Sequence, residues 1–387
     1  MTLASPERVH VGAERQIQRA HTDRFPYGAD PSRVPRSSSA IAAEATARIH
    51  VAPYAGGVRT RVLALVVGVA VLVGASPARS APPANDARRI YAVGVASETL
   101  TDPTRPPPEV PALGIAAVAT RTIPVTVWYP ARGPVTPEPT RDAPVAHGRF
   151  PLIVYAPGNG ALGANAPALV RSWAAHGYVI VAPDFPVSSR ARSNLDAIDD
   201  WANQPGDIRF LLDRALGDGI AGLRSALDRG RVGLAGHSLG AMTVLAAAFG
   251  ADADPRVDAV TTFAGIPLLG GTDVSSRETP LLLVHGDDDR TIPVQQSRTM
   301  FDAAAGPRVL VTIAGGGHSP YLYQPDPETA KALATATTTF WDATLRHRST
   351  GAGWRGDPDT RLLGLAVPGR IAVEVGPAPN LPALGRR

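Results

Sequence analysis

The feature that most constrains the fold is the segment Arg231–Gly250, RVGLAGHSLGAMTVLAAAFG. A short run of small and branched apolar residues ends at Ser238, which stands between Gly236 and Gly240 in a G-x-S-x-G pattern, and an alanine-rich stretch follows. A strand, a sharp turn and a helix in this order can hold a serine hydroxyl at the carboxyl edge of a parallel sheet. Glycine and serine are also common in turns, so a purely structural turn is the alternative.

From residue 81 onward, short apolar runs rich in β-branched residues alternate with longer helical patterns. This alternation predicts an α/β fold, with a mostly parallel, eight-stranded sheet and helices on both faces. The first two strands have no helix between them and should pair antiparallel. We expect strands at Tyr91–Ala96, Ile123–Tyr129, Leu152–Ala156, Tyr178–Ala182, Val232–Ala235, Ala259–Phe263, Leu281–His285 and Val309–Ile313. We expect helices near Ala164–Ala175, Ile208–Leu216, Leu239–Phe249, Gln295–Ala304 and Pro327–Arg346.

The segment before residue 81 predicts a secretory signal peptide. Arg59 and Arg61 precede the uncharged run Val62–Ala75, which is too short for a membrane span of about 20 residues. Residues 78–80 (ARS) offer small residues at a cleavage site. We expect export from the cell or to the periplasm, with a mature chain that begins near Ala81 and keeps no stable membrane span. The alternative is an uncleaved anchor or a buried helix. The expected parts are a disordered or mis-assigned leader at 1–57, the signal peptide at 58–80, one α/β domain at 81–348 and a Gly/Pro-rich tail at 349–387 with at most one further strand, near Ile371–Val375.

Composition argues against several classes of partner and site. The net charge of +4 and the pI of about 9.7 come from scattered arginines, with Lys331 as the only lysine and no cluster of arginine with aromatic residues. We therefore expect no nucleic-acid binding. Cysteine is absent, which excludes disulfides, thiolate metal sites and a cysteine nucleophile.

A serine nucleophile needs a base, and His318 is the best placed of the nine histidines. It follows the expected strand Val309–Ile313 and three glycines, so a flexible loop can carry it over Ser238. His237, inside the turn, is expected to point away from the serine hydroxyl, and His285 is expected to pack or bond a turn at a strand end. An ordinary surface loop is the alternative for His318.

A third group must orient the imidazole and stabilise its cation. Asp287, Asp288 and Asp289 stand just beyond the expected strand Leu281–His285. The chain order is then Ser, Asp, His, as in α/β-hydrolases. A cation site is the alternative use of three adjacent acids, but no further spaced acids complete a ligand loop, and the chain lacks the HExxH motif of zinc hydrolases.

Donors for an oxyanion are available at two turns. The strand Leu152–Ala156 runs into residues 157–160 (PGNG), a loop that can aim a backbone N–H at the site. The second donor is the N–H of Leu239, directly after the nucleophile. An ordinary strand-to-helix turn is the alternative for the first loop.

Together these motifs resemble the α/β-hydrolase superfamily over about residues 91–346, and within it the dienelactone hydrolase-like branch. That branch includes platelet-activating-factor acetylhydrolase-like esterases, chlorophyllase-like proteins and cutinase-like polyester hydrolases. The matching segments are VWYPA, PLIVYAPGNG, GHSLG, HGDDDRTIP and GGGHSP. The branch's HG-x-x-D spacing places the acid at Asp289. The aromatic clamp of the polyester hydrolases has only Phe263 as a counterpart here, and this weakens the case for polyester as the substrate.

The resemblance implies a secreted, monomeric serine hydrolase of carboxylic esters that needs no metal or organic cofactor. Ser238 is the expected nucleophile, His318 the base and then the acid, and Asp289 the group that holds His318. The N–H groups of Asn159 and Leu239 are expected to bind the oxyanion. Expected substrates are small-molecule or accessible polymeric esters, because no long insertion predicts a large lid. Three alternatives stay open: an acyltransferase with the same triad, a polyester hydrolase, and a non-catalytic secreted binding protein.

Overall fold

The computed structural model describes residues 89–190, 198–346, 362–364 and 366–376. The chain divides into two compact units, Met1–Ser76 and Pro77–Arg387, and every described residue belongs to the second. The expected leader and signal peptide therefore lie outside the described residues.

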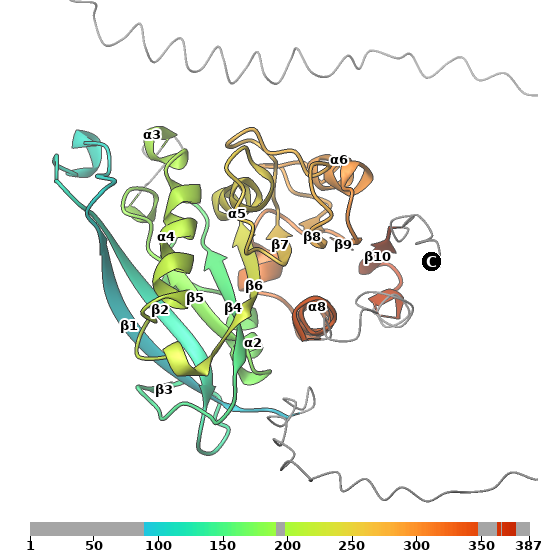
Figure 1. Ribbon diagram of the computed structural model, residues 1–387. Helices are drawn as coiled ribbons and strands as arrows, with labels where there is room; N and C mark the ends of the chain where they lie inside the picture. The colour runs from blue at the N-terminus through green and yellow to red at the C-terminus, as the bar shows by residue number, and fades with distance from the viewer. Residues whose placement is uncertain (1–88, 191–197, 347–361, 365, 377–387) are drawn as a thin grey trace, which may run out of the picture. The chain divides into compact units, whose positions relative to one another are not determined.

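The second unit is built on one ten-stranded sheet with the order β10-β9-β8-β7-β6-β4-β5-β2-β1-β3 (Figure 1). The strands are β1 (Ala92–Asp102), β2 (Arg121–Ala131), β3 (Thr140–Arg141), β4 (Phe150–Ala156), β5 (Val179–Pro183), β6 (Leu227–His237), β7 (Ala259–Phe263), β8 (Leu281–Gly286), β9 (Arg308–Ile313) and β10 (Ile371–Val375). The pairs from β5 through β4, β6, β7 and β8 to β9 are parallel. β1–β2, β2–β5 and β9–β10 are antiparallel. The mostly parallel sheet with an antiparallel start is as predicted.

Burial explains why the central strands form. β4, β5, β7 and β8 are buried along their whole length, which their continuous apolar sequences predict for strands covered on both faces. The first half of β2 alternates instead: Ile123 and Val125 are buried, whereas Thr122 and Pro124 are exposed. This period of two is typical of a strand with one face towards water.

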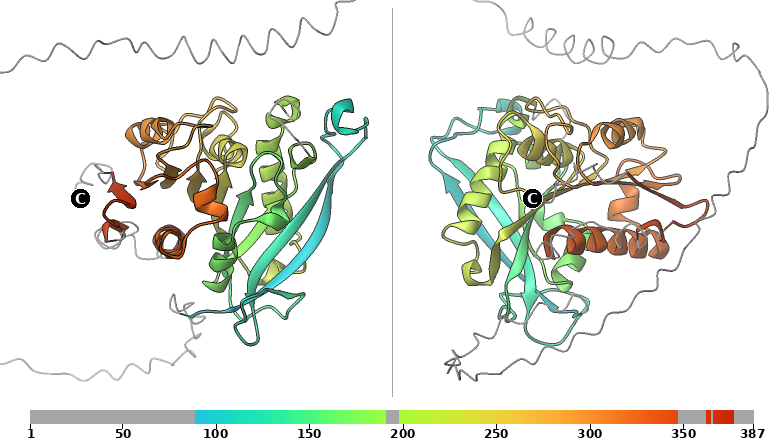
Figure 2. Two further views of the ribbon diagram at one scale, coloured as in Figure 1. Left: turned by 180° about the vertical axis from the view of Figure 1, so that it is seen from behind. Right: turned by 45° about the vertical axis from the view of Figure 1, so that its right-hand side comes forward.

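Helices cover both faces of the sheet (Figure 1, Figure 2). One apolar core includes residues of α4 (Gln204–Leu216), α5 (Leu239–Phe249) and α6 (Gln295–Ala303), and the other includes residues of α2 (Ala168–Ala175) and α8 (Pro327–Trp341). Two short helices were not expected, α3 (Ile198–Trp201) and α7 (Pro320–Tyr323). No helix in the described part of the chain is long and apolar enough to cross a membrane.

The structure corrects the expected extent of the sheet. The sheet of the described residues has ten strands where the main run of the chain predicted eight. The short β3, which was not expected, pairs with β1, and β10, the one further strand expected near Ile371–Val375, pairs with β9. β1 continues to Asp102, and β6 begins at Leu227, well before the apolar run that starts at Val232. Backbone pairing with β2 and β4 holds these polar segments in the sheet.

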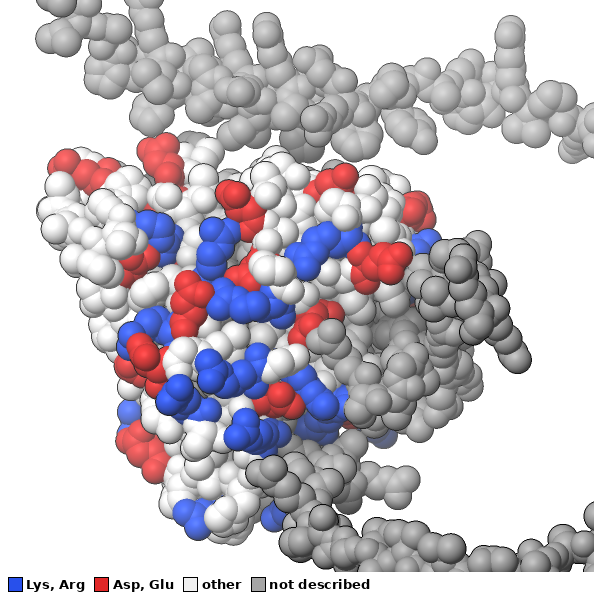
Figure 3. Space-filling view, viewed as in Figure 1, with Lys and Arg blue, Asp and Glu red and all other residues white. Residues whose placement is uncertain are grey.

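Basic and acidic side chains intermingle on the face seen in Figure 3. Arg256 pairs with Asp213 and Asp254, and Arg214 pairs with Asp218. These arginines are neutralised locally rather than joined in one basic field.

Candidate active site

Four of the expected site residues each follow a parallel strand at its carboxyl end. Asn159 follows β4, Ser238 follows β6, Asp289 follows β8 and His318 follows β9. Because these strands are parallel and neighbours within the sheet order, their carboxyl ends share one edge. The topology therefore gathers residues that are up to 159 positions apart at one place.

Ser238 lies on a sharp turn between β6 and α5. Its φ of 55° and ψ of −119° fall in a region that non-glycine residues rarely adopt, at a cost of about 1–3 kcal/mol. A side chain at Gly236 would overlap the backbone of Gly240, and one at Gly240 would overlap the carbonyl oxygen of Ala156. Close backbone approach thus requires both glycines, as the sequence predicted.

A continuous series of hydrogen bonds joins Ser238, His318 and Asp289. The Ser238 Oγ lies 2.8 Å from His318 Nε2, and His318 Nδ1 lies 2.7 Å from Asp289 Oδ2. An ionised carboxylate can only accept hydrogen bonds, so Nδ1 carries the ring proton and Nε2 presents its lone pair to the serine hydroxyl. The hydroxyl therefore faces a group that can take its proton.

Asp289 is buried, and both of its carboxylate oxygens are bound. Oδ2 faces His318, while Oδ1 accepts from the N–H groups of Thr291 at 2.8 Å and Ile292 at 2.9 Å. Burial raises the pKa of Asp289, but the hydrogen bonds from Ile292 and His318 outweigh this effect and hold the pKa below its usual value. The carboxylate is therefore ionised at neutral pH.

The two neighbouring acids make different contacts. Asp288 is exposed and lies 3.3 Å from Arg290 Nε, an arrangement that contributes little to stability. Asp287 Oδ1 accepts from the N–H of Gly315 at 2.6 Å, and the N–H of Asp288 donates to the carbonyl oxygen of Gly316. The acid loop and the histidine loop are thus joined directly, which the sequence did not reveal. Among the described residues, no group of three or more His, Asp or Glu side chains is placed to hold a metal ion.

His237 supports the histidine loop from inside the turn. Its Nε2 lies 3.0 Å from the carbonyl oxygen of His318, and its ring packs at centroid distances of 5.1 Å from the His318 ring and 5.4 Å from the Tyr323 ring. Burial lowers the pKa of His237 to about 4, so the ring is neutral at pH 7 and Nε2–H can donate to that carbonyl. The G-x-S-x-G pattern leaves this position variable, so sequence reasoning assigned it no role.

The loop after β4 lies against the turn that carries the nucleophile. A side chain at Gly158 would come within 3.5 Å of Ser238 Cβ, so the adjacent Asn159 begins close to the serine. Leu239 is the first residue of α5. The N–H groups of a helix's first turn have no partner within the helix and favour negative charge. An anion formed at Ser238 would thus meet the N-terminal end of α5.

Comparisons with known proteins bear on the fold. The Chlorophyllase family model matches residues 117–294, a span that contains Ser238 and Asp289 and ends before His318. A structure of a ferulic acid esterase from Streptomyces cinnamoneus has a TM-score of 0.53 and 20% sequence identity, over 73% of this chain and 96% of that chain. The chain shares the fold of that structure. No curated protein sequence matches it.

The α/β-hydrolase fold predicted from the motifs is thereby confirmed. The family model is named Chlorophyllase and the solved structure is named an esterase, and these names support the class of enzyme that the motifs predicted, a carboxylic ester hydrolase.

His285 steadies the loop that carries Asp289. The ring is fully buried; Nδ1 lies 2.7 Å from Ser297 Oγ, and Nε2 lies 2.8 Å from the carbonyl oxygen of Ile292 and 3.2 Å from Asp289 Oδ2. Burial lowers the pKa of His285, so the ring is neutral at pH 7. The expected packed, turn-bonding role is confirmed, and the bonded turn is the one that carries Asp289.

An apolar cluster includes the residue next to Ser238. It consists of buried Leu239, Met242 and Ile292 with partly buried Trp201, Ile266 and Leu269. Leu239 follows the nucleophile directly, and Ile292 lies three residues past Asp289. Leu268, between two cluster members, is 51% exposed. An apolar group of a molecule bound at Ser238 would therefore find apolar side chains beside it.

Proposed function

We propose that the protein is a secreted, monomeric serine hydrolase that cleaves carboxylic esters. The observation that carries the proposal is the hydrogen-bond series from Ser238 through His318 to Asp289, built on a strained turn. The signal-like segment at 58–80 supports secretion. The matching motifs favour the dienelactone hydrolase-like branch within the superfamily.

In the first half of the reaction, the Ser238 Oγ attacks the ester carbonyl while His318 Nε2 takes the hydroxyl proton. The N–H groups of Asn159 and Leu239 bind the oxyanion, and Asp289 stabilises the imidazolium. The oxyanion then collapses, the bond to the alcohol oxygen breaks, and His318 gives its proton to the departing alcohol. The acyl group stays on Ser238.

In the second half, water takes the place of the alcohol. His318 accepts a proton from the water as its oxygen attacks the acyl carbonyl. The same two N–H groups bind the second oxyanion. When it collapses, the carboxylic acid leaves and His318 returns the proton to Ser238 Oγ. Water is the only other reactant consumed.

The apolar cluster beside Ser238 supports esters with an apolar acyl or alcohol group as substrates. Leu268, which lies in the sequence between two members of the cluster, is exposed, and this supports small esters and accessible chain ends of polymers as substrates.

The test is a panel of p-nitrophenyl esters of increasing acyl length, with methyl ferulate and a polyester film alongside. We expect turnover of the soluble esters and a loss of about six decades in kcat for Ser238→Ala, as nucleophile loss produces in serine hydrolases. Near wild-type activity in that variant would exclude the proposal. An added alcohol acceptor distinguishes the acyltransferase alternative, because transfer yields a new ester in place of the free acid.

A further inference from the structure

The two N–H groups proposed to bind the oxyanion belong to different parts of the fold. Asn159 lies in the loop after β4, and Leu239 begins α5. Both donors must lie about 2.7–3.1 Å from the same oxygen to stabilise it. Their spacing therefore depends on whatever holds the loop relative to the helix.

The loop is held from the segment that follows β5. The N–H of Gly160 donates to the carbonyl oxygen of Ser188 at 2.7 Å, and the N–H of Gly163 donates to Asp184 Oδ1 at 2.6 Å. Gly160 is the immediate neighbour of Asn159. The position of the first donor thus follows the position of Ser188.

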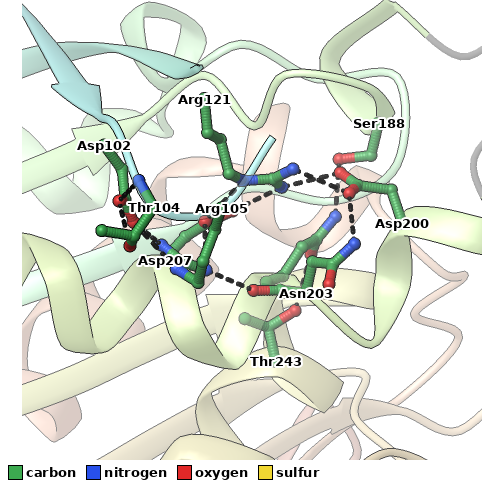
Figure 4. Close-up of polar contacts among 10 residues, drawn as sticks. Asp102, Thr104, Arg105, Arg121, Ser188, Asp200, Asn203, Asp207 and Thr243 are labelled. Carbon is green, nitrogen blue, oxygen red and sulfur yellow. Dashed lines mark hydrogen bonds and ion pairs between the residues drawn. The ribbon is translucent and has the colours of Figure 1, made fainter. Parts of the chain in front are cut away.

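A side-chain amide connects Ser188 to the helix that carries the second donor. Gln204 Nε2 donates to Ser188 Oγ at 2.9 Å, and Thr243 Oγ1 donates to Gln204 Oε1 at 2.7 Å. Thr243 Oγ1 also lies 3.0 Å from the carbonyl oxygen of Leu239. The side chains of Ser188, Gln204 and Thr243 are buried; Figure 4 shows Ser188 and Thr243 in this network.

A buried ion cluster holds the start of the helix that carries this amide. Gln204 is the first residue of α4. Arg121 of β2 donates to Asp200 of α3 at 2.7 and 2.8 Å, and to Asp207 of α4 at 2.6 and 2.7 Å. All three charged side chains are fully buried (Figure 4). The start of α4 is therefore bound to the sheet, and Gln204 has little freedom to shift.

We propose that Gln204 is a positioning residue that sets the spacing of the two oxyanion donors by bridging Ser188 and Thr243. The proposal rests on the proposed ester hydrolysis at Ser238. The amide supplies a donor for Ser188 Oγ and an acceptor for Thr243 Oγ1. An apolar side chain would lose both contacts.

The test measures kcat per titrated active site, KM, and inhibition by a boronic acid that mimics the tetrahedral oxyanion. Three variants break the bridge: Gln204→Met, Ser188→Ala and Thr243→Val. We expect kcat to fall roughly tenfold, which is less than the loss of a donor causes, with KM nearly unchanged and boronate affinity falling in parallel. The acidic limb of the pH profile should not move, because the contact of His318 with Asp289 is untouched.

A double variant sharpens the test. Ser188→Ala and Thr243→Val act through one amide, so their combined loss should be clearly smaller than the product of the single losses. If Gln204→Met does not fold, these two milder variants decide the question.

Thr337→Val is the matched control. Thr337 is a buried threonine on α8 that accepts from Trp173 Nε1 at 2.9 Å and lies 2.7 Å from the carbonyl oxygen of Leu333. The substitution Thr337→Val should lower the melting temperature and leave kcat unchanged. If the bridge variants keep kcat and boronate affinity within twofold of the wild type, or fall no further than Thr337→Val, Gln204 has only a structural role and the proposal is wrong. Failure of the wild-type protein to hydrolyse esters would instead overturn the proposed function on which this inference rests.

Discussion

Replacing Asp289 by asparagine should cripple the site without disturbing its shape. The Oδ1 position of Asp289 accepts two backbone N–H groups, from Thr291 and Ile292, so the amide oxygen introduced by Asp289→Asn must take that position. The amide NH₂ then faces His318 Nδ1, where the carboxylate Oδ2 stood at 2.7 Å. An NH₂ group donates, so Nδ1 must accept, and the ring proton moves to Nε2.

The size of the expected loss of kcat follows from this change of tautomer. With a proton on Nε2, His318 cannot take the proton of Ser238 Oγ across the 2.8 Å that separates them. The negative charge that stabilises the imidazolium is lost as well. The same substitution in serine proteases lowers kcat by about four decades, which corresponds to about 5.5 kcal/mol of activation free energy. We expect a loss of this size.

The assay compares three variants with one soluble ester at a single pH above neutrality, with folding checked by circular dichroism. Asp288→Asn should stay close to wild type, because its exposed carboxylate pairs with the exposed Arg290. Asp287→Asn should lose an intermediate amount, since its oxygen joins the acid loop to Gly315. If Asp289→Asn retains more than a tenth of the wild-type kcat, the assignment of the orienting acid is wrong.

Three further predictions concern stability and processing. Burial lowers the pKa of His237 from 6.5 to about 4, so between these pH values the unfolded chain binds a proton that the folded ring does not. The free energy of unfolding should therefore fall by up to about 3 kcal/mol as the pH drops through this window. Urea titrations should show a smaller fall in the variant His237→Gln. Arg121→Met should cost roughly 3–5 kcal/mol, because Asp200 stays buried without a cation and Asp207 keeps only the partly exposed Arg105. Arg214→Gln at an exposed ion pair should cost less than about 1 kcal/mol, and equal costs in urea unfolding would contradict this account. The intact mass of exported protein should correspond to a start near Ala81, and a species that retains Val62–Ala75 would indicate an anchor.

The parts of the fold that could be predicted are those with a local pattern. β7 and α5 have the predicted bounds, because a run of buried β-branched residues and an alanine-rich stretch each carry their own signal. The positions of Ser238 and His318 after strands could be read in the same way, since glycine-rich turns after apolar runs mark the carboxyl edge of a parallel sheet.

The parts that could not be predicted depend on partners far along the chain. The polar start of β6 at Leu227 is a strand only because β4 pairs with it. A strand near Ile371–Val375 was expected, but its place in the sheet was not, because β10 pairs with β9, more than fifty residues upstream. Nothing in the sequence around Gln204 or Arg121 marks them as buried, because their partners lie from 16 to 86 positions away. Such contacts are properties of the packed structure and leave no periodic trace.

The most direct test of the account is active-site labelling with a fluorophosphonate probe, followed by peptide mass mapping. The account predicts one adduct per chain, on the peptide that contains Ser238, with ester hydrolysis lost in proportion to labelling and no adduct in Ser238→Ala. An adduct at another residue, or full ester hydrolysis by a chain labelled at Ser238, would contradict the claim that this serine is the nucleophile.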